Sequence, residues 1–391
     1  MLPKAEKDTK VVTNYRPINP LNTMGKLFEK VIARRIYYHF NEINFFNEYQ
    51  RAYLKKKEAA EHVYCLAEEI HLAKAKGWVT TAASLDMEKA FDSVWHDGLR
   101  YKLSQLQLPV KTVRLLSSFL TDRTIKVRVD DAMSHSVSLE AGTPQGSVLS
   151  PLLFLIYVND LPVEASNNCM AGQFADDTNQ WTTSSSKKIT YLRLQRALSD
   201  VQKWCSKWRI KLNVGKTQLV SFSGHKKKMK LKMFGECITE QTELKFLGVT
   251  FDKLKGFTTH CRGKASEASR RAQLLRAVSG QKWGANTRTL LRLYKQYIRP
   301  VLETGCVATW NATKCNLKTM QKVQNSALRT VLRENRWSKI KITELHERTG
   351  IETLTERFKS LCSKAVLRFG DSKNMRKLAV MKTLLSDIVD T

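Results

Sequence analysis

The sequence predicts an α+β fold, because it combines short apolar runs with longer helical ones. Residues 79–85 and 170–174 have the length and composition of buried strands. Segments at 24–43 and 191–208 repeat apolar residues with a helical period. From Cys261 onward the chain turns helical and basic. Strands in the first part and helices in the second are typical of this fold class.

The composition indicates a large folded chain with a polyanionic partner. The 391 residues suffice for two or three subdomains, and 42% are hydrophobic, as in ordinary globular proteins. Sixty-six Lys and Arg against 36 Asp and Glu leave a formal net charge of +30, which favours nucleic acid as the partner. A membrane surface is the rival, but no stretch approaches about eighteen uninterrupted apolar residues.

The cysteines and the first residues indicate the compartment. The eight cysteines form no C-x-x-C pair and no Cys/His spacing of a metal site, so they are predicted to be reduced thiols. Residues 1–10 are polar and mixed in charge, unlike the apolar core of a signal peptide. We therefore expect an intracellular protein, cytoplasmic or nuclear, rather than a secreted one.

Adjacent carboxylates after a strand are the chain's main chemical signal. Asp176 and Asp177 repel each other, and both reach one site only if the strand ends there in a hairpin. Asp86 stands in the same way at the end of the run 79–85. Three carboxylates on neighbouring strand ends can hold two Mg²⁺ ions about 4 Å apart, an arrangement suited to phosphoryl transfer. For the pair alone, a solvated Asp-Asp turn is the alternative.

Before the acids we expect two helices and a strand. Pro17 and Pro20 exclude a regular helix at the start, so the first helix covers residues 24–43. A second covers 58–76, and the strand 78–85 follows it.

Between Asp86 and the acid pair, the pattern alternates between helix and strand. Asp92 is expected to cap a helix that begins at Ser93. Residues 124–129 alternate as a half-exposed strand, and the glycines of 142–146 give a flexible turn before an apolar helix.

Beyond the acid pair we expect a helix at 191–208, four short strands and further helices. The strands cover residues 219–222, 231–234, 237–239 and 244–251. The later helices cover residues 320–332 and 353–369.

Several segments resemble a known family. Three resemble, in order and spacing, successive palm motifs of reverse transcriptases: Asp86 with Ala90-Phe91-Asp92, Gly142-Thr143-Pro144-Gln145-Gly146-Ser147, and Phe174-Ala175-Asp176-Asp177. Four more resemble the non-LTR retrotransposon branch, nearest the jockey-like elements of animals: residues 14–18, 25–30, 211–217 and 246–249.

The resemblance implies a right-hand polymerase fold. Residues 1–78 would form the fingers, and 79–252 the palm, an antiparallel sheet with helices behind it, inserted fingers elements and primer-grip strands at its end. Residues 253–300 would form a basic helical thumb and 301–391 a helical C-terminal extension. The implied activity is RNA-directed DNA synthesis. Its partners would be an RNA template, a DNA primer, the RNA–DNA hybrid and deoxynucleoside triphosphates, and no membrane.

The resemblance also assigns the chemical roles. Asp86, Asp176 and Asp177 would bind two Mg²⁺ ions, or Mn²⁺ in their place, and Lys216 would lie near the leaving pyrophosphate as a general acid or charge stabiliser. Phe91 would lie under the sugar and exclude a 2′-hydroxyl. A core aromatic ring is the alternative for Phe91, and a solvated loop cation is the alternative for Lys216.

The remaining assigned residues contact nucleic acid or nucleotide. Gln145, Gly146 and Arg16 would contact the template or the incoming nucleotide, with a solvated cation as the alternative for Arg16. The primer grip would be Phe246, Leu247 and Gly248.

One stretch departs from the family pattern. Where the family has Gln-Phe-Gly-Phe-Arg, this chain has Gln50-Arg51-Ala52-Tyr53-Leu54, so the arginine that cradles nucleotide phosphates falls on Leu54. Lys55 and Lys56 are the candidate substitutes, but lysine lacks the bidentate fork of arginine.

Two further hypotheses stay open. The family usually joins an endonuclease to its polymerase, and fingers-like residues begin near Asn14, so we expect a truncated copy. Together with Leu54, this favours a catalytically impaired nucleic-acid-binding relic as the alternative function. An RNA-dependent RNA polymerase is the third reading, against which Phe91 speaks. The sequence identifies no protein partner.

Overall fold

The computed structural model describes most of the chain. The described residues are 2–3, 8, 10–11, 15–16, 18–19, 21–129, 131–163, 169–224, 228–253, 256–280, 283–310, 312–334, 340–370, 372, 374–376 and 378–379.

A four-stranded antiparallel sheet forms the centre of the molecule. Its strand order is β10-β3-β9-β8, and every neighbouring pair is antiparallel. The strands are β3 (Val79–Leu85), β8 (Cys169–Phe174), β9 (Asp177–Ser184) and β10 (Gln218–Phe222). The predicted antiparallel sheet is therefore confirmed.

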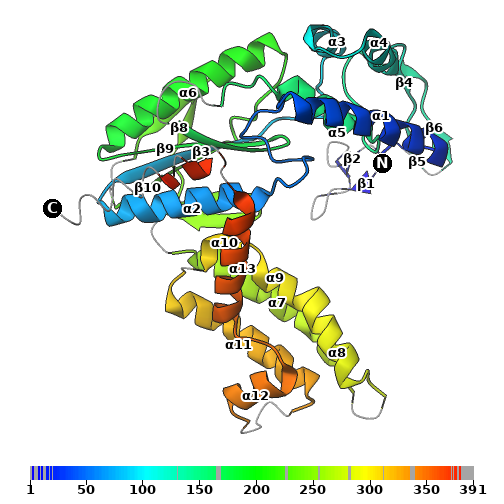
Figure 1. Cartoon of the computed structure of the whole chain (residues 1–391). Helices are drawn as coiled ribbons and strands as arrows, with labels where there is room; N and C mark the ends of the chain where they lie inside the picture. Colours follow the sequence, from blue (N-terminus) through cyan, green and yellow to red (C-terminus); the bar gives the residue numbers. More distant parts are fainter. Residues whose placement is uncertain are drawn as a thin grey trace.

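Both faces of this sheet are buried, so consecutive residues along its strands are buried rather than alternately exposed, and β9 buries polar residues as well as Trp181. Ala82 and Trp181 belong to one hydrophobic core, and Ala83 and Leu85 belong to the other. Helix α6 (Lys187–Lys207) covers one face and α2 (Ala59–Ala75) the other (Figure 1). Helices thus lie on both sides of the sheet.

Four helices form a layer beside the sheet: α1 (Thr23–Glu42), α3 (His96–Gln105), α4 (Val110–Phe119) and α5 (Leu149–Val158) (Figure 1). Helix α5 is buried along almost its whole length, as its continuous apolar sequence requires. Short strands lie near them: β1 (Leu2–Pro3), β2 (Tyr15–Arg16), β4 (Thr124–Ile125), β5 (Arg128–Val129), β6 (Ala132–Met133) and β7 (Val137–Ser138).

Two expectations in this layer were wrong. The strand 124–129 is broken into β4 and β5, which pair with different partners. Helix α3 begins at His96 with Trp95 as its N-cap, so Asp92 does not cap it. Asp92 instead accepts a hydrogen bond from the side chain of Gln145, at 2.9 Å.

Two hairpins follow the sheet: β11 (Lys230–Met233) with β12 (Glu236–Thr239), and β13 (Glu243–Phe246) with β14 (Val249–Asp252). The single strand expected over 244–251 is therefore wrong. Leu247 and Gly248 both have positive φ, 47° and 79°, as a two-residue hairpin turn of type I′ requires. The sequence pattern predicted one strand because buried apolar residues recur in both strands of this hairpin and its turn has only two residues.

From residue 258 onward the described chain is helical, and most of these helices extend away from the sheet (Figure 1). Its elements are α7 (Thr258–Ala277), α8 (Thr287–Leu293), the π-helical turn η2 (Tyr294–Ile298), α9 (Arg299–Glu303), α10 (Cys306–Thr309), α11 (Lys314–Val331), α12 (Ile342–Thr349) and α13 (Leu354–Phe369). Residues on both sides of the predicted thumb boundary at 300 share one core. Among the described helices, none combines the length and the apolar character needed to cross a bilayer.

A buried carboxylate joins the sheet to the segments after it. Glu240 is 4% exposed and accepts hydrogen bonds from Lys187 and Lys253, each at 2.8 Å, and from the Tyr191 hydroxyl at 3.0 Å. Burial on its own raises the pKa of Glu240, but the hydrogen bonds from the two lysines and the tyrosine outweigh it and hold the pKa below its ordinary value. The charged form of Glu240 therefore stabilises the fold.

We expect Glu240→Gln to lower the free energy of unfolding by about 3 kcal/mol at pH 7, because the substitution leaves Lys187 buried without its counter-charge. Since the pKa of Glu240 is lowered on folding, its contribution is present above the unfolded pKa of 4.5 and is lost as the pH falls through the folded pKa. Urea denaturation at pH 7 and in steps below pH 4.5 measures both effects.

The control is Glu267→Gln, which removes a more exposed acid paired with Lys264 and Arg271 and is expected to cost less than about 1 kcal/mol. Equal losses in the two variants would contradict the role given to Glu240.

Candidate active site

The hairpin of β8 and β9 carries the acid pair at its tip. Phe174 pairs with Asp177, so Ala175 and Asp176 form the two-residue turn between the strands. Ala175 is buried and has φ of +56°, a left-handed conformation that costs energy for any residue with a Cβ. The backbone is thus strained where the two carboxylates meet.

The third acid arrives from the neighbouring strand. Leu85 pairs with Thr178, so Asp86 follows β3 at the level of Asp177. The backbone of Asp86 is held by Asn213, whose N–H donates to its carbonyl at 2.9 Å. The sheet register therefore brings together Asp86, Asp176 and Asp177, which lie about 90 residues apart in the chain.

The carboxylates influence one another electrostatically. Partial burial raises the pKa of Asp177, and the charges of Asp176 and then Asp86 raise it further. Lys216 lies beside them, with its Nζ 3.4 Å from Oδ2 of Asp86. Lys216 and Asp86 are both partly solvent-accessible, so this ion pair contributes little to stability.

The donor set suits a hard divalent cation. All three side chains offer carboxylate oxygen, and their mutual repulsion is relieved by a positive ion between them. In the part of the chain that the structure describes, no three His, Cys, Asp or Glu side chains already converge at metal-ligand separations. The acids therefore fit Mg²⁺ or Mn²⁺ by the chemistry of their donor atoms, although the three side chains do not converge at ligand separations in this structure.

The glycine-containing loop 142–147 lies beside Phe91 and is bonded along its length. The N–H of Thr143 donates to the carbonyl of Phe91 at 2.8 Å, and the side chain of Gln145 donates to Asp92. The ring of Phe91 is half-buried and packs against Phe154, with ring centroids 4.9 Å apart. Phe91 and Gln145 thus belong to one rigid unit.

Gly146 faces the segment before α1. It has φ of +116°, and a Cβ there would lie 2.7 Å from the carbonyl oxygen of Asn19. The neighbouring Gln145 carbonyl accepts from the Asn19 N–H at 2.9 Å. Only glycine allows this close approach. The side chain of Arg16, which we expected near the nucleotide or template, lies outside the described residues.

Sequence reasoning missed Glu29, a buried acid on α1. Its Oε2 accepts from Ser147 Oγ at 2.7 Å, from the N–H of Val148 at 2.6 Å and from that of Leu149 at 3.4 Å. Glu29 therefore caps helix α5 from another helix and fixes the end of the loop 142–147. The available signal was its spacing to Ala33, which places an acid on the buried face of α1.

The predicted primer grip is the turn of the β13–β14 hairpin. Phe246 is 2% exposed and stacks against His62, with ring centroids 6.5 Å apart. A Cβ on Gly172 of β8 would lie 3.0 Å from the Phe246 ring, so the glycine lets this ring reach the sheet. Leu247 is half-buried and Gly248 exposed, so these two are the part of the motif that can meet a ligand.

The stretch 50–56, whose sequence departs from the family pattern, lies against the outer edge of β8. Lys55 and Lys56 are exposed, and Leu54 is half-buried. Lys55 lines a hollow of about 260 Å³ together with Leu54 and Arg51. The guanidinium of Arg51 is buried in an ion pair with Glu61 at 2.7 Å, so it serves the fold rather than an exposed site.

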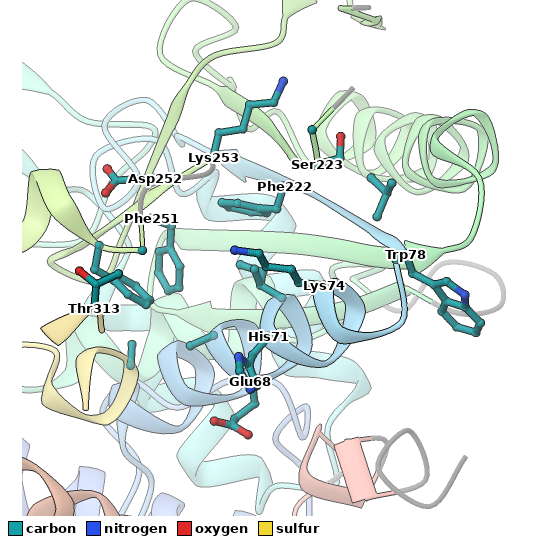
Figure 2. A pocket seen from close by; sticks show the side chains of 18 residues that line it. Glu68, His71, Lys74, Trp78, Phe222, Ser223, Phe251, Asp252, Lys253 and Thr313 are labelled. Atoms are coloured by element: carbon teal, nitrogen blue, oxygen red, sulfur yellow. The ribbon is translucent and has the colours of Figure 1, made fainter. Parts of the chain in front are cut away.

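An apolar cavity of about 370 Å³ lies at the other end of the sheet from the acids. Figure 2 shows Phe222 and Phe251 beside Lys74 of α2. Val79, the first residue of β3, also lines it, whereas Asp86 follows the last residue of that strand. Seven strand residues separate the two ends by about 23 Å, so this cavity is not part of the acid site.

We expect Glu29→Ala to raise amide exchange at Val148 and to cost about 2 kcal/mol of unfolding free energy, because Ser147 Oγ and the Val148 N–H lose their acceptor, whereas the Leu149 N–H keeps Ser147 Oγ. Glu29→Gln keeps an acceptor oxygen and should cost about half as much. Hydrogen exchange and urea denaturation measure the two effects. Glu42→Ala, at the exposed end of α1, is the control. Unchanged exchange at Val148 in Glu29→Ala would contradict the capping role.

Comparison with known proteins places this geometry in a family. The model of the reverse transcriptase (RNA-dependent DNA polymerase) family matches residues 2–251. The probable RNA-directed DNA polymerase from transposon BS of Drosophila melanogaster is 28% identical over 98% of this chain and 43% of its own length. The RNA-directed DNA polymerase from mobile element jockey of the same species is 27% identical over 85% of this chain and 37% of its own length.

The chain thus spans less than half the length of these relatives. Among solved structures, apo telomerase from Candida tropicalis is 13% identical, with a TM-score of 0.42, over 91% of this chain and 61% of its own. A likeness that distant carries nothing about function. The family match covers the acid hairpin, the loop 142–147 and Lys216 in one alignment. The chain belongs to the reverse transcriptase family, with relatives among the jockey-like non-LTR retrotransposons.

Proposed function

We propose that this chain catalyses RNA-directed DNA synthesis, adding deoxynucleotides to a primer 3′ end on an RNA template. The observation that carries the proposal is the meeting of Asp86 with Asp176 and Asp177 at one end of the sheet, next to Lys216. Family membership supports the same reaction. Deoxynucleoside triphosphates and an RNA–DNA hybrid are the corresponding partners.

The acids and the lysine of the site have different roles in this reaction. Asp86, Asp176 and Asp177 hold two divalent cations, which when bound lower the pKa of the primer 3′-hydroxyl and neutralise the triphosphate. The sheet register, which sets the backbones of Asp86 and Asp177 side by side at the ends of neighbouring strands, supports this role. Lys216 is exposed and its ion pair with Asp86 is solvent-accessible, so little free energy opposes its exchange to the pyrophosphate, where its Nζ supplies charge or a proton.

The basic helices after the palm provide the surface for the hybrid. Exposed cationic residues on α7, α8 and the η2 turn are Arg262, Arg270, Arg276, Arg288, Arg292 and Lys295. An A-like hybrid is held mainly through phosphates and shape, which a row of such side chains suits. Lys282, predicted to join them, lies outside the described residues.

We expect Asp176→Asn to reduce primer extension on an RNA template by about 100-fold or more, because one charged oxygen ligand is lost. The amide has the size of the acid, so hybrid binding and thermal stability should be kept. Asp200→Asn, which removes an exposed acid on α6, is the control and should extend primers normally. Equal background synthesis by the wild type and Asp176→Asn would refute the enzymatic proposal.

The competing function is a binding relic without turnover. Leu54 in place of the phosphate-cradling arginine favours it, since neither Lys55 nor Lys56 offers a bidentate fork. Tight hybrid binding that weakens steeply with salt, together with no extension by the wild type, would establish the relic.

We expect Phe91→Val to increase ribonucleotide incorporation relative to deoxynucleotide incorporation by about tenfold or more, because the smaller side chain makes room for a 2′-hydroxyl. The ratio of kcat/KM for a matched nucleotide pair measures this. Phe119→Val, on α4, is the matched control for loss of a half-buried ring. A wild type that prefers ribonucleotides would instead support an RNA polymerase.

A further inference from the structure

The strand that carries the acid pair lies at the edge of the sheet. In the order β10-β3-β9-β8, only one side of β8 is paired within the sheet. The backbone groups of Ala171, Gln173 and Ala175 alternate along the other side, and buried backbone groups require partners. These three residues are bonded by two other parts of the chain, residues 49–51 and Asn374.

Two of the three positions, Gln173 and Ala171, are bonded by the backbone of residues 49–51 and by the side chain of Asn374. The N–H of Gln173 donates to the carbonyl of Tyr49, and the N–H of Arg51 donates to the carbonyl of Gln173, each at 3.0 Å. The carbonyl of Ala171 accepts from the side chain of Asn374 at 2.8 Å. Residues 49–51 thus run beside β8 as a short parallel neighbour.

The third position is completed by a side chain alone. The chain turns away after Arg51, and Tyr53 has φ of +57°. The amide of Gln50 then spans the gap: its Oε1 accepts from the N–H of Ala175 at 3.0 Å, and its Nε2 lies 3.4 Å from the Ala175 carbonyl, to which it donates. Gln50 is 3% exposed.

Gln50 is itself held in place. Its Oε1 also accepts from the N–H of Ala52 at 3.0 Å, and its backbone is bridged to Gln173. The side chain has no freedom to leave the turn without losing three hydrogen bonds. The Gln50 amide therefore bonds both the N–H and the C=O of Ala175. Ala175 has a left-handed backbone conformation and directly precedes Asp176.

We propose that Gln50 is a positioning residue for the acid pair, acting through the backbone of Ala175 on the place and spacing of Asp176 and Asp177. This inference rests on the proposed function for its catalytic consequence. The repulsion between the carboxylates and the strain at Ala175 both push the turn to open, and the Gln50 amide opposes them. Gln50 touches neither substrate nor the acids.

The test compares Gln50→Met with Gln324→Met in the full chain. Methionine keeps the volume of glutamine and removes its hydrogen bonds. Gln324 is an equally buried glutamine, 1% exposed, that accepts from the Tyr294 hydroxyl and donates to the carbonyl of Glu352, in the helical half of the molecule. Both variants should lose similar stability, and only one should disturb the acid turn.

The first readout needs neither metal nor activity. In Gln50→Met we expect hydrogen exchange at the Ala175 amide to accelerate by about tenfold or more, while the Gln173 amide, bonded to Tyr49, stays protected. In Gln324→Met both amides should exchange as in the wild type. Unchanged exchange at Ala175 in Gln50→Met, or equal acceleration at Gln173, would overturn the proposal.

The second readout tests the link to the acids. We expect the Mn²⁺ concentration for half-maximal primer extension to rise about fivefold or more in Gln50→Met, with the KM for deoxynucleotide changed less than about twofold. An increase in KM alone would contradict positioning of the acids. If the wild type makes no DNA, the proposed function fails, and Mn²⁺ titration by calorimetry with the exchange data still decides the role of Gln50.

Discussion

The free edge of β8 is the constraint on which the site depends. A strand at a sheet edge leaves every second backbone group unpaired, and here that strand ends in the turn of Asp176. Partners for the edge come from residues 49–51 and from Asn374, which lie more than 120 residues before and about 200 residues after it. The acid turn is therefore fixed only when distant parts of the chain have folded onto the same edge.

Residues at the end of the helical part of the chain also contact the segment that supports β8. Arg368, near the end of α13, donates two hydrogen bonds to Glu58 at 2.7 and 3.1 Å, and Ser372 donates to Glu61 at 2.5 Å. Glu61 also holds the buried guanidinium of Arg51. A role thereby emerges for the C-terminal residues, about which the sequence said little: they cover the α2 side of the segment that supports β8.

The sequence was informative where a local pattern and the tertiary environment agree. Helix α5 is apolar almost all round and follows the glycine-containing turn as expected, and Asp86 follows a strand as predicted. It failed where a contact between distant segments decides the structure. Asp92 looks like a cap but bonds Gln145, and Glu29 looks like a surface acid but caps α5. The spacing of apolar and polar residues along one segment does not predict such contacts, because they depend on which elements meet in space.

The backbone strain at Ala175 also has a physical reason. A glycine at 175 would relax the left-handed turn, but it would let the acids spread under their mutual repulsion. Alanine restricts the backbone, and hydrogen bonds to both of its polar groups offset the cost of its φ of +56°. The strain lies at Ala175, at the tip of the hairpin, while the buried carboxyl groups of Glu29 and Glu240 accept hydrogen bonds that stabilise the surrounding elements. Under the proposed function, rigid strands on either side would convert a local hydrogen bond into a defined spacing of carboxylates, as the binding of a pair of cations would require.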